Sequence, residues 1–304
     1  MRPRICERAW SMERRRPARV LESRLRHANL LRRRARDRTE PASVALNKTL
    51  RMDVRAIRGD IGQPRAAAES AYRIPVGRSR FLGQLPERDV KRLMPLLRRV
   101  EIVPRQVLHD RNLPVEHVHF LESGLVSVMA KVSGRDWVEA WPFGSEGTTS
   151  LPVMLGDAQP PLRRVVQIGG TALRVSAAVF REFLGTSEPL RSMLMQYAQL
   201  ILLQSCQLGA CNGQHSVRQR LGRWLLLARD SLEAARIAMS HQALARLMGV
   251  RRATISECLG EMEARGAIRT GRRLIEITDA AALESLSCDC YRAIRRERQR
   301  LLGT

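Results

Sequence analysis

The chain has 304 residues, of which 44% are hydrophobic and 27% charged, and this length is enough for about two domains. Its 53 lysines and arginines against 30 aspartates and glutamates give a net charge of +23, which favours a polyanionic partner such as nucleic acid. No apolar run approaches the ~20 residues of a membrane span, and the start, MRPRICERAWSMERRRP, lacks the apolar core of a signal peptide. With six cysteines, we expect a protein of the reducing cytoplasm that does not enter a membrane.

Residues 1–78 hold much of the positive charge. Between residues 1 and 79 lie 21 basic and 8 acidic residues, which is more than half of the excess. Because this segment is poor in apolar clusters, we predict a disordered, arginine-rich extension, or sequence upstream of a true start at Met52. A basic arm that adds nonspecific phosphate contacts is the alternative.

Regular apolar spacing begins near Ser79. Short amphipathic helices are predicted over 81–97, and beyond Val100 the hydrophobic period changes from about 3.6 residues to 2. Many short strands separated by turns such as Ser133-Gly134 predict an antiparallel β-roll of the jelly-roll kind over 79–185. The expected strands are 100–103, 106–109, 117–122, 125–132, 137–141, 164–168 and 172–175.

A long helix with two apolar stripes is predicted within 186–214. One stripe has heptad spacing and consists of Leu190, Leu194, Tyr197, Ile201, Gln204, Leu208 and Cys211. The other consists of Met193, Leu200 and Leu203. Because a helix that is apolar on two faces must bury both, we expect one stripe to pack on the β-roll and the heptad stripe to form a dimer seam. A helix buried within one chain is the alternative.

Two helices joined by a tight turn are predicted over 240–266. Ser240 is a suitable N-cap, and Gly249 stands where a left-handed turn residue is needed. A second helix over 251–265 would bury an apolar stripe and present its first turn to the major groove. The residues expected at base edges are Arg251, Arg252, Thr254 and Ser256.

A β-hairpin with a basic tip follows over 267–277, as in the wing of a winged helix, and a last helix is predicted over 279–302. The DNA-binding domain would then cover 215–302. Contacts to phosphates, which set position without selecting sequence, are expected from Ser240, Gln242, Arg269, Arg272 and Arg273.

This order of an α+β chain, with a β-roll, a long helix and a winged helix-turn-helix, resembles the CRP/FNR family of bacterial transcription regulators over 79–302. The motifs that carry the resemblance are HVHFLESGLVSV (117–128), SHQALARLMGVRRATISECLGEMEARGAI (240–268) and the wing. The resemblance implies a homodimer that senses a signal at the β-roll and binds a palindromic operator in double-stranded DNA, with half-sites about one helical turn apart. The family's activators also touch RNA polymerase.

The sensor segment departs from the cyclic-nucleotide-binding members of the family. Where those members have a Gly-Glu pair for the ribose, this chain has Ser150-Leu151, and leucine cannot accept a hydrogen bond. Arg163 and Arg164 could meet an anion, but neither is followed by the Ser or Thr of the family's phosphate site. We therefore expect neither cyclic AMP nor cyclic GMP, predict no cofactor, and leave the signal open. The candidate effector residues are Ser145, Glu146, Ser150, Arg163 and Arg164.

The recognition helix also departs from the family pattern Arg-Glu-x-x-x-Arg. Arg252 matches the first arginine and could pair with guanine. Ala253 cannot accept a hydrogen bond from cytosine, and Glu257 reverses the charge of the last position. The operator is therefore expected to differ from the family's usual half-site.

Other functional classes find little support in the sequence. There is no phosphate-binding loop, nucleophile elbow or clustered set of metal ligands, so we expect no enzyme and no metal site. The cysteines Cys206, Cys211, Cys288 and Cys290 are interpreted as small buried residues, with redox or metal sensing as the alternative. A nonspecific nucleic-acid-binding protein that uses the basic N-terminal segment is a further alternative.

Overall fold

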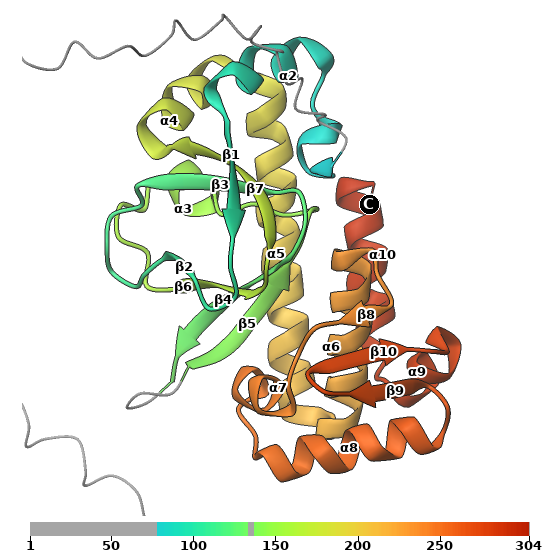
Figure 1. Ribbon diagram of the computed structural model, residues 1–304. Coiled ribbons are helices and arrows are strands. Elements are labelled where there is room, and N and C mark those ends of the chain that lie inside the picture. The colour runs from blue at the N-terminus through green and yellow to red at the C-terminus, as the bar shows by residue number, and fades with distance from the viewer. Residues whose placement is uncertain (1–77, 133–136, 304) are drawn as a thin grey trace, which may run out of the picture. The chain divides into compact units, whose positions relative to one another are not determined.

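A computed structural model of the chain describes residues 78–132 and 137–303, which belong to one compact unit (Figure 1). The extension predicted over 1–78 lies outside the described residues except for Arg78, as does the turn predicted at Ser133-Gly134. No helix in the described part of the chain is long and apolar enough to cross a membrane.

Two antiparallel sheets form the predicted β-roll. One has the strand order β1-β7-β3 and the other β2-β6-β4-β5. The strands are β1 (Arg98–Ile102), β2 (Val107–His109), β3 (His117–Leu121), β4 (Leu125–Lys131), β5 (Trp137–Phe143), β6 (Arg163–Ile168) and β7 (Gly170–Ser176). All seven expected strands are present, with ends shifted by at most two residues, because apolar side chains that alternate along a strand can be buried only on the inner face of a sheet.

Short helices close one end of the roll. They are η2 (Leu82–Gln84), α2 (Glu87–Leu93), η3 (Met94–Leu96), α3 (Leu151–Met154) and α4 (Ala177–Thr186). Aromatic rings connect them to the sheet and to the long helix that follows. The Phe81 ring stacks on Phe120 at 5.9 Å and meets Tyr197 edge-on at 5.4 Å, while Phe120 lies 5.9 Å from Phe180. These contacts make one core from segments far apart in the sequence.

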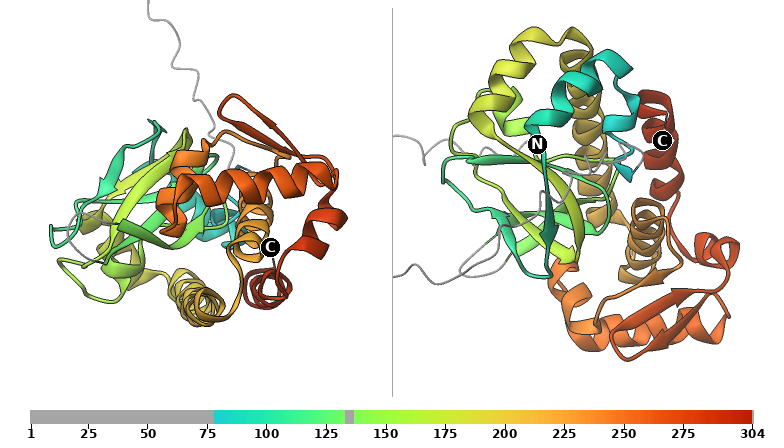
Figure 2. Two further views of the ribbon diagram at one scale, coloured as in Figure 1. Left: turned by 90° about the horizontal axis from the view of Figure 1, so that it is seen from below. Right: turned by 45° about the horizontal axis from the view of Figure 1, so that its top comes forward.

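The long helix α5 (Glu188–Gln214) runs beside the roll and beside the last helix of the chain, α10 (Cys290–Leu302) (Figures 1 and 2). This contact corrects the predicted dimer seam. The heptad stripe Leu190, Leu194, Tyr197, Ile201, Gln204 and Leu208 is at most 8% exposed within the single chain. The spacing correctly predicted a buried stripe, but the roll and the C-terminal domain cover it, and no second chain is needed.

The C-terminal domain contains the predicted winged helix-turn-helix. Its elements are α6 (Val217–Leu232), β8 (Arg236–Ile237), α7 (His241–Met248), α8 (Arg252–Ala264), β9 (Ile268–Gly271), β10 (Leu274–Ile277), α9 (Ala280–Leu286) and α10. The single helix expected over 279–302 is two helices. Ser287 adopts an extended conformation (φ −89°, ψ 177°) and ends α9. It lies close to Gly222 of α6, where an added Cβ would be 3.2 Å from the Ser287 Cβ.

Candidate nucleic-acid interface

The helix-turn-helix forms where its local signals predict. The Ser240 hydroxyl accepts a hydrogen bond from the Ala243 amide at 3.2 Å, which satisfies a free N–H at the start of α7. Gly249 ends α7 in the left-handed region (φ 66°, ψ 35°), a conformation with little cost only for glycine. Ala245 is 1% exposed, so a small residue faces the crossing helix. Gln242 is exposed beside the cap.

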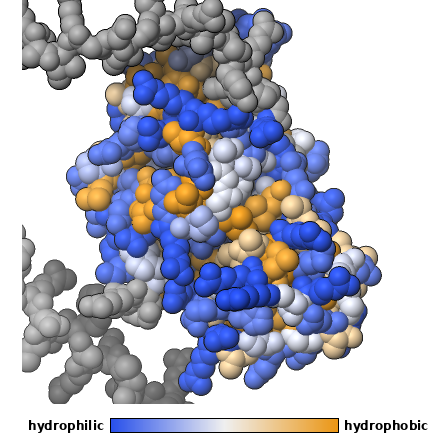
Figure 3. Space-filling view, in the orientation of Figure 1, coloured by the Kyte–Doolittle hydropathy of each residue, from blue (hydrophilic) through white to orange (hydrophobic). Residues whose placement is uncertain are grey.

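The recognition helix α8 has one buried face and one open face. Its buried residues are Ile255, Cys258, Leu259 and Met262. At its N-terminal end Arg251 and Arg252 are exposed, and Thr254 is half-buried. Figure 2 (left) shows α8 facing the viewer when the molecule is seen from below, and hydrophilic residues cover much of this lower end in Figure 3. The first turn of α8 is therefore free to enter a groove.

Ser256, predicted at a base edge, has a partner within the protein. Its Oγ lies 2.9 Å from Nδ1 of His241, at the start of α7. The pair ties the two helices together, so Ser256 supports the angle between them. Sequence reasoning missed His241, although its place one residue after the Ser240 cap puts it next to the recognition helix.

The wing is a hairpin of β9 and β10, with β8 on the other side of β10. Arg272 and Arg273 are exposed at its tip, and Arg273 has a positive φ of 56°. Arg269 is also exposed and lies 3.9 Å from Glu276. Glu263 of α8 accepts hydrogen bonds at 2.7 Å from both the amide and the hydroxyl of Thr270. These bonds hold the wing against the recognition helix and lower the pKa of Glu263.

Comparison with known proteins agrees with this geometry. A family model described as the Crp-like helix-turn-helix domain matches residues 219–286. FixK2 from Bradyrhizobium japonicum has a TM-score of 0.55 at 16% identity, covering 63% of this chain and 98% of that chain. The chain has the CRP/FNR fold and a Crp-like helix-turn-helix domain. No curated protein sequence matches it.

Two further solved structures share the CRP/FNR fold. One is a putative transcriptional regulator of the crp/fnr family from Eubacterium rectale, with a TM-score of 0.54 at 15% identity, covering 69% of this chain and 98% of that chain. The other is CLP, a c-di-GMP-responsive global regulator from Xanthomonas campestris, with a TM-score of 0.51 at 18% identity, covering 63% and 99%.

In this CRP/FNR fold, strand β5 contacts the helix-turn-helix domain directly. The indole Nε1 of Trp224, on α6, donates a hydrogen bond to the Glu139 carboxylate at 2.6 Å, and Ser127 donates another. An added Cβ at Gly249 would lie 3.2 Å from Val138, so the turn between α7 and α8 also reaches this strand. The sheet that contains β5 and the turn of the helix-turn-helix therefore touch within one chain.

A second contact follows β5 in the loop around Glu146. This buried carboxylate lies 3.1 Å from Arg80 and 3.4 Å from Arg298 of α10, and accepts a hydrogen bond from the Ser231 hydroxyl at 2.6 Å. Burial alone would raise the pKa of Glu146, but the charges of Arg298 and Arg80 lower it below its usual range. The backbone packs tightly here, since an added Cβ at Gly144 would lie 2.4 Å from the Ser231 carbonyl oxygen.

The candidate effector residues are engaged in separate contacts. Ser145 accepts a hydrogen bond from Arg80 at 2.9 Å, and Glu146 belongs to the ion-pair network described above. Arg163 pairs with Asp110 at 2.7 Å. Arg164 is buried, contacts His109 at 3.2 Å, and has its pKa lowered by burial to about 10.

Ser150 is buried, and its hydroxyl has no hydrogen-bond partner in the described structure. The structure thus does not gather the five expected effector residues around one ligand position. Glu146 instead joins the roll to the C-terminal domain, and Ser145 contacts Arg80, which also donates to the Asp230 carbonyl.

Proposed function

We propose that the chain is a sequence-specific DNA-binding transcription regulator that reads bases with the first turn of α8. The observation that carries this proposal is the exposure of Arg251 and Arg252 at the free end of a helix whose other face is buried. Arginine can donate two hydrogen bonds to the O6 and N7 atoms of guanine. The basic wing beside α8 supplies charges that suit phosphates.

Arg252→Ala is expected to relax the preference at one base pair by about 1–3 kcal/mol, because it removes a bidentate contact. Arg272→Ala is the matched control, since it removes the same side chain from the wing tip. Arg272→Ala should weaken binding to all DNA sequences by a similar factor. It should also reduce the slope of the logarithm of the binding constant against the logarithm of the salt concentration by about 1. Selection of bound sites from a randomised DNA pool measures both effects. An unchanged base profile for Arg252→Ala would contradict the base-reading role.

We also propose that two copies pair through the outer face of α5. Met195 and Leu202 lie seven residues apart and are 63% and 64% exposed, and Leu203 beside them is 38% exposed. Gly209 and Gly213 continue this face without nearby side chains, so a second helix could approach closely. A dimer would present two α8 helices to a palindromic operator. The occupied heptad stripe is not part of this surface.

Leu202→Asp is expected to weaken the dimer by about 100-fold or more, since like charges facing each other across an interface cost several kcal/mol. Leu113→Asp is the control, because Leu113 is also exposed (54%) but lies in a loop of the roll. Sedimentation at several protein concentrations measures the dissociation constant. A Leu202→Asp chain with the same dimer dissociation constant as the parent chain would show that this face of α5 is not the dimer interface.

A further inference from the structure

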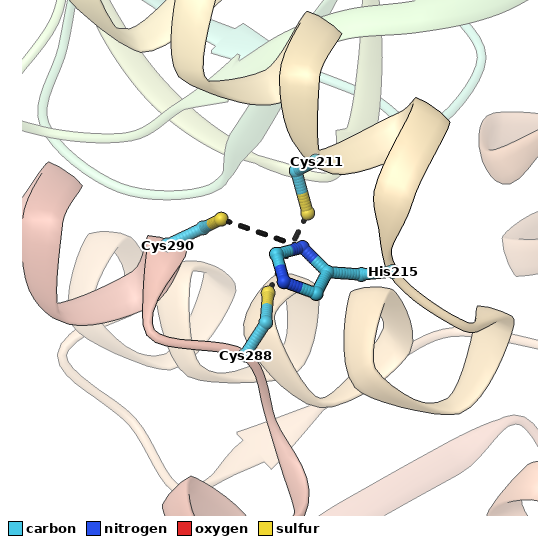
Figure 4. A group of neighbouring side chains, drawn as sticks. All are labelled: Cys211, His215, Cys288 and Cys290. Atoms are coloured by element: carbon cyan, nitrogen blue, oxygen red, sulfur yellow. Dashed lines mark hydrogen bonds between the residues drawn. The ribbon is translucent and has the colours of Figure 1, made fainter.

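Four metal-ligating side chains meet where α5 ends and α10 begins. Cys211, His215, Cys288 and Cys290 each offer one ligand atom, and these atoms lie within 4.8 Å of one another. The sulfur atoms and the imidazole ring point toward a shared centre (Figure 4). No metal site was expected, since the sequence has no clustered set of metal ligands, and Cys211 and Cys288 are 77 residues apart in it. The prediction that cysteines are buried is correct for Cys211, Cys288 and Cys290 but wrong for Cys206, which is exposed on α5.

The separations suit a tetrahedral ion. Zinc–sulfur bonds of about 2.3 Å place the sulfur atoms of a tetrahedral site roughly 3.8 Å apart. The sulfurs of Cys211 and Cys288 are 3.5 Å apart, and the Cys290 sulfur lies 3.6 Å from Nδ1 of His215. Three thiols and one imidazole form a frequent ligand set of structural zinc sites. A disulfide would use only two of the four groups.

Local structure explains how both pairs of ligands reach this point. Cys211 and His215 are four residues apart at the end of α5, so they share one face. Cys288 and Cys290 flank the break between α9 and α10, with Cys290 in the first turn of α10. Gly222 allows this break to approach α6, since Ser287 lies against it. The break that sequence analysis missed therefore delivers two of the ligands.

Two polar side chains lie beside the cluster, Gln207 and Arg223. Gln207 donates a hydrogen bond to the Cys290 sulfur at 3.1 Å. Arg223 of α6 is 6% exposed, and its Nε has no hydrogen-bond partner in the described structure. Burial raises the pKa of the Cys211 and Cys288 thiols, and the charge of Arg223 opposes this rise. Three thiolates around a divalent ion leave one net negative charge, which this arginine offsets.

We propose that the chain holds one divalent metal ion of the zinc class on Cys211, His215, Cys288 and Cys290. His215 is also the residue that ends α5, in an extended conformation (φ −105°, ψ 147°), immediately before α6 begins. The ion therefore ties the α5–α6 junction to the start of α10. It holds the C-terminal domain at one angle to α5.

Metal content and cobalt spectroscopy of the full chain test the site. Protein reconstituted with zinc under reducing conditions and then dialysed should retain about one ion per chain, as measured by mass spectrometry of the metal. Replacing zinc by cobalt should produce the visible absorption of tetrahedral, thiolate-bound cobalt. Absence of this absorption in the reduced parent chain overturns the proposal. The proposal is also overturned if the isolated protein contains a Cys211–Cys288 disulfide and binds no cobalt after this disulfide has been reduced.

Variants separate ligand loss from misfolding. Cys288→Ser should lose the zinc and the cobalt absorption, whereas Cys206→Ser should keep both, because Cys206 is exposed on α5 outside the cluster. His215→Cys keeps four ligands, so it should bind cobalt with an altered spectrum, which unfolding would not produce. Equal zinc in Cys288→Ser and Cys206→Ser overturns the assignment.

The effect of the ion on DNA binding rests on the proposed function. Removing the metal with a chelator should weaken operator binding by about ten-fold or more, within the usual range of coupling between two sites. Readdition of zinc should restore it. An unchanged affinity of the metal-free chain for the operator would overturn the proposal that the ion holds the C-terminal domain at one angle to α5. Failure of the zinc-loaded chain to bind any DNA sequence would contradict the proposed function and leave the metal site standing.

Discussion

Glu146→Gln is expected to lower the free energy of unfolding by about 3–5 kcal/mol, because removing one partner of a buried ion pair leaves the buried Arg298 without compensation. The substitution keeps the volume of the side chain and its bond with Ser231. It removes the charge that Arg80 and Arg298 share. Arg298 is 5% exposed, so water cannot replace the lost carboxylate. Chemical denaturation measures the change.

Glu188→Gln is the matched control for this variant. Glu188 pairs with Arg191 at 2.6 Å, but its side chain is 75% exposed, and exposed pairs contribute less than about 1 kcal/mol. Replacing Arg298 by Met in the Glu146→Gln chain should recover part of the loss, since the uncompensated charge is then gone. A Glu146→Gln chain as stable as the Glu188→Gln chain would show that the buried network contributes little.

Glu139→Gln is expected to stabilise the chain at pH 8 and to have a much smaller effect at pH 5. Burial raises the pKa of Glu139 to about 7, against hydrogen bonds from Ser127 and Trp224 and the charge of Arg223, which lower it. The unfolded chain releases this proton near its usual pKa of 4.5. Between these values the folded chain holds more protons, so its stability falls as pH rises and levels off above pH 7.

The difference between the two pKa values corresponds to about 3 kcal/mol at 1.36 kcal/mol per unit. Glutamine cannot ionise, so the variant should lack this decline. Urea unfolding of the parent and variant chains from pH 5 to pH 8 gives the difference between their free energies of unfolding at each pH. The other titrating groups are the same in both chains, so their contributions cancel in this difference. A difference that stays constant over this range would show that Glu139 does not titrate there. Glu146 acts in the opposite sense, since its lowered pKa favours the folded chain above the usual carboxyl range.

Both carboxylates connect β5 and its following loop to the C-terminal domain. Glu139 accepts a bond from Trp224, near the middle of α6, and Glu146 accepts one from Ser231, near its end. Sequence reasoning missed these contacts because Trp224 lies 85 residues from Glu139 and Ser231 lies 85 residues from Glu146.

Local patterns were sufficient for the elements of this protein. Strands, caps and turns depend on neighbours a few residues apart, so the alternation in the roll, the Ser240 cap and the left-handed Gly249 were predictable from the sequence. The exposed arginines of α8 followed from the same spacing, because the buried stripe of a helix determines which residues lie opposite it.

Contacts between distant segments decided the rest. The heptad pattern of α5 showed that a stripe is buried, but only the packing of the roll and the C-terminal domain showed what covers it, because spacing carries no information about the partner. The break at Ser287 brings Cys288 to Cys211, and no local signal joins those two positions. By itself the sequence determined a winged helix-turn-helix with exposed arginines at the start of its second helix, α8. The tertiary structure decided which face of α5 stays open and which cysteines meet, since both depend on chain segments that only folding brings together.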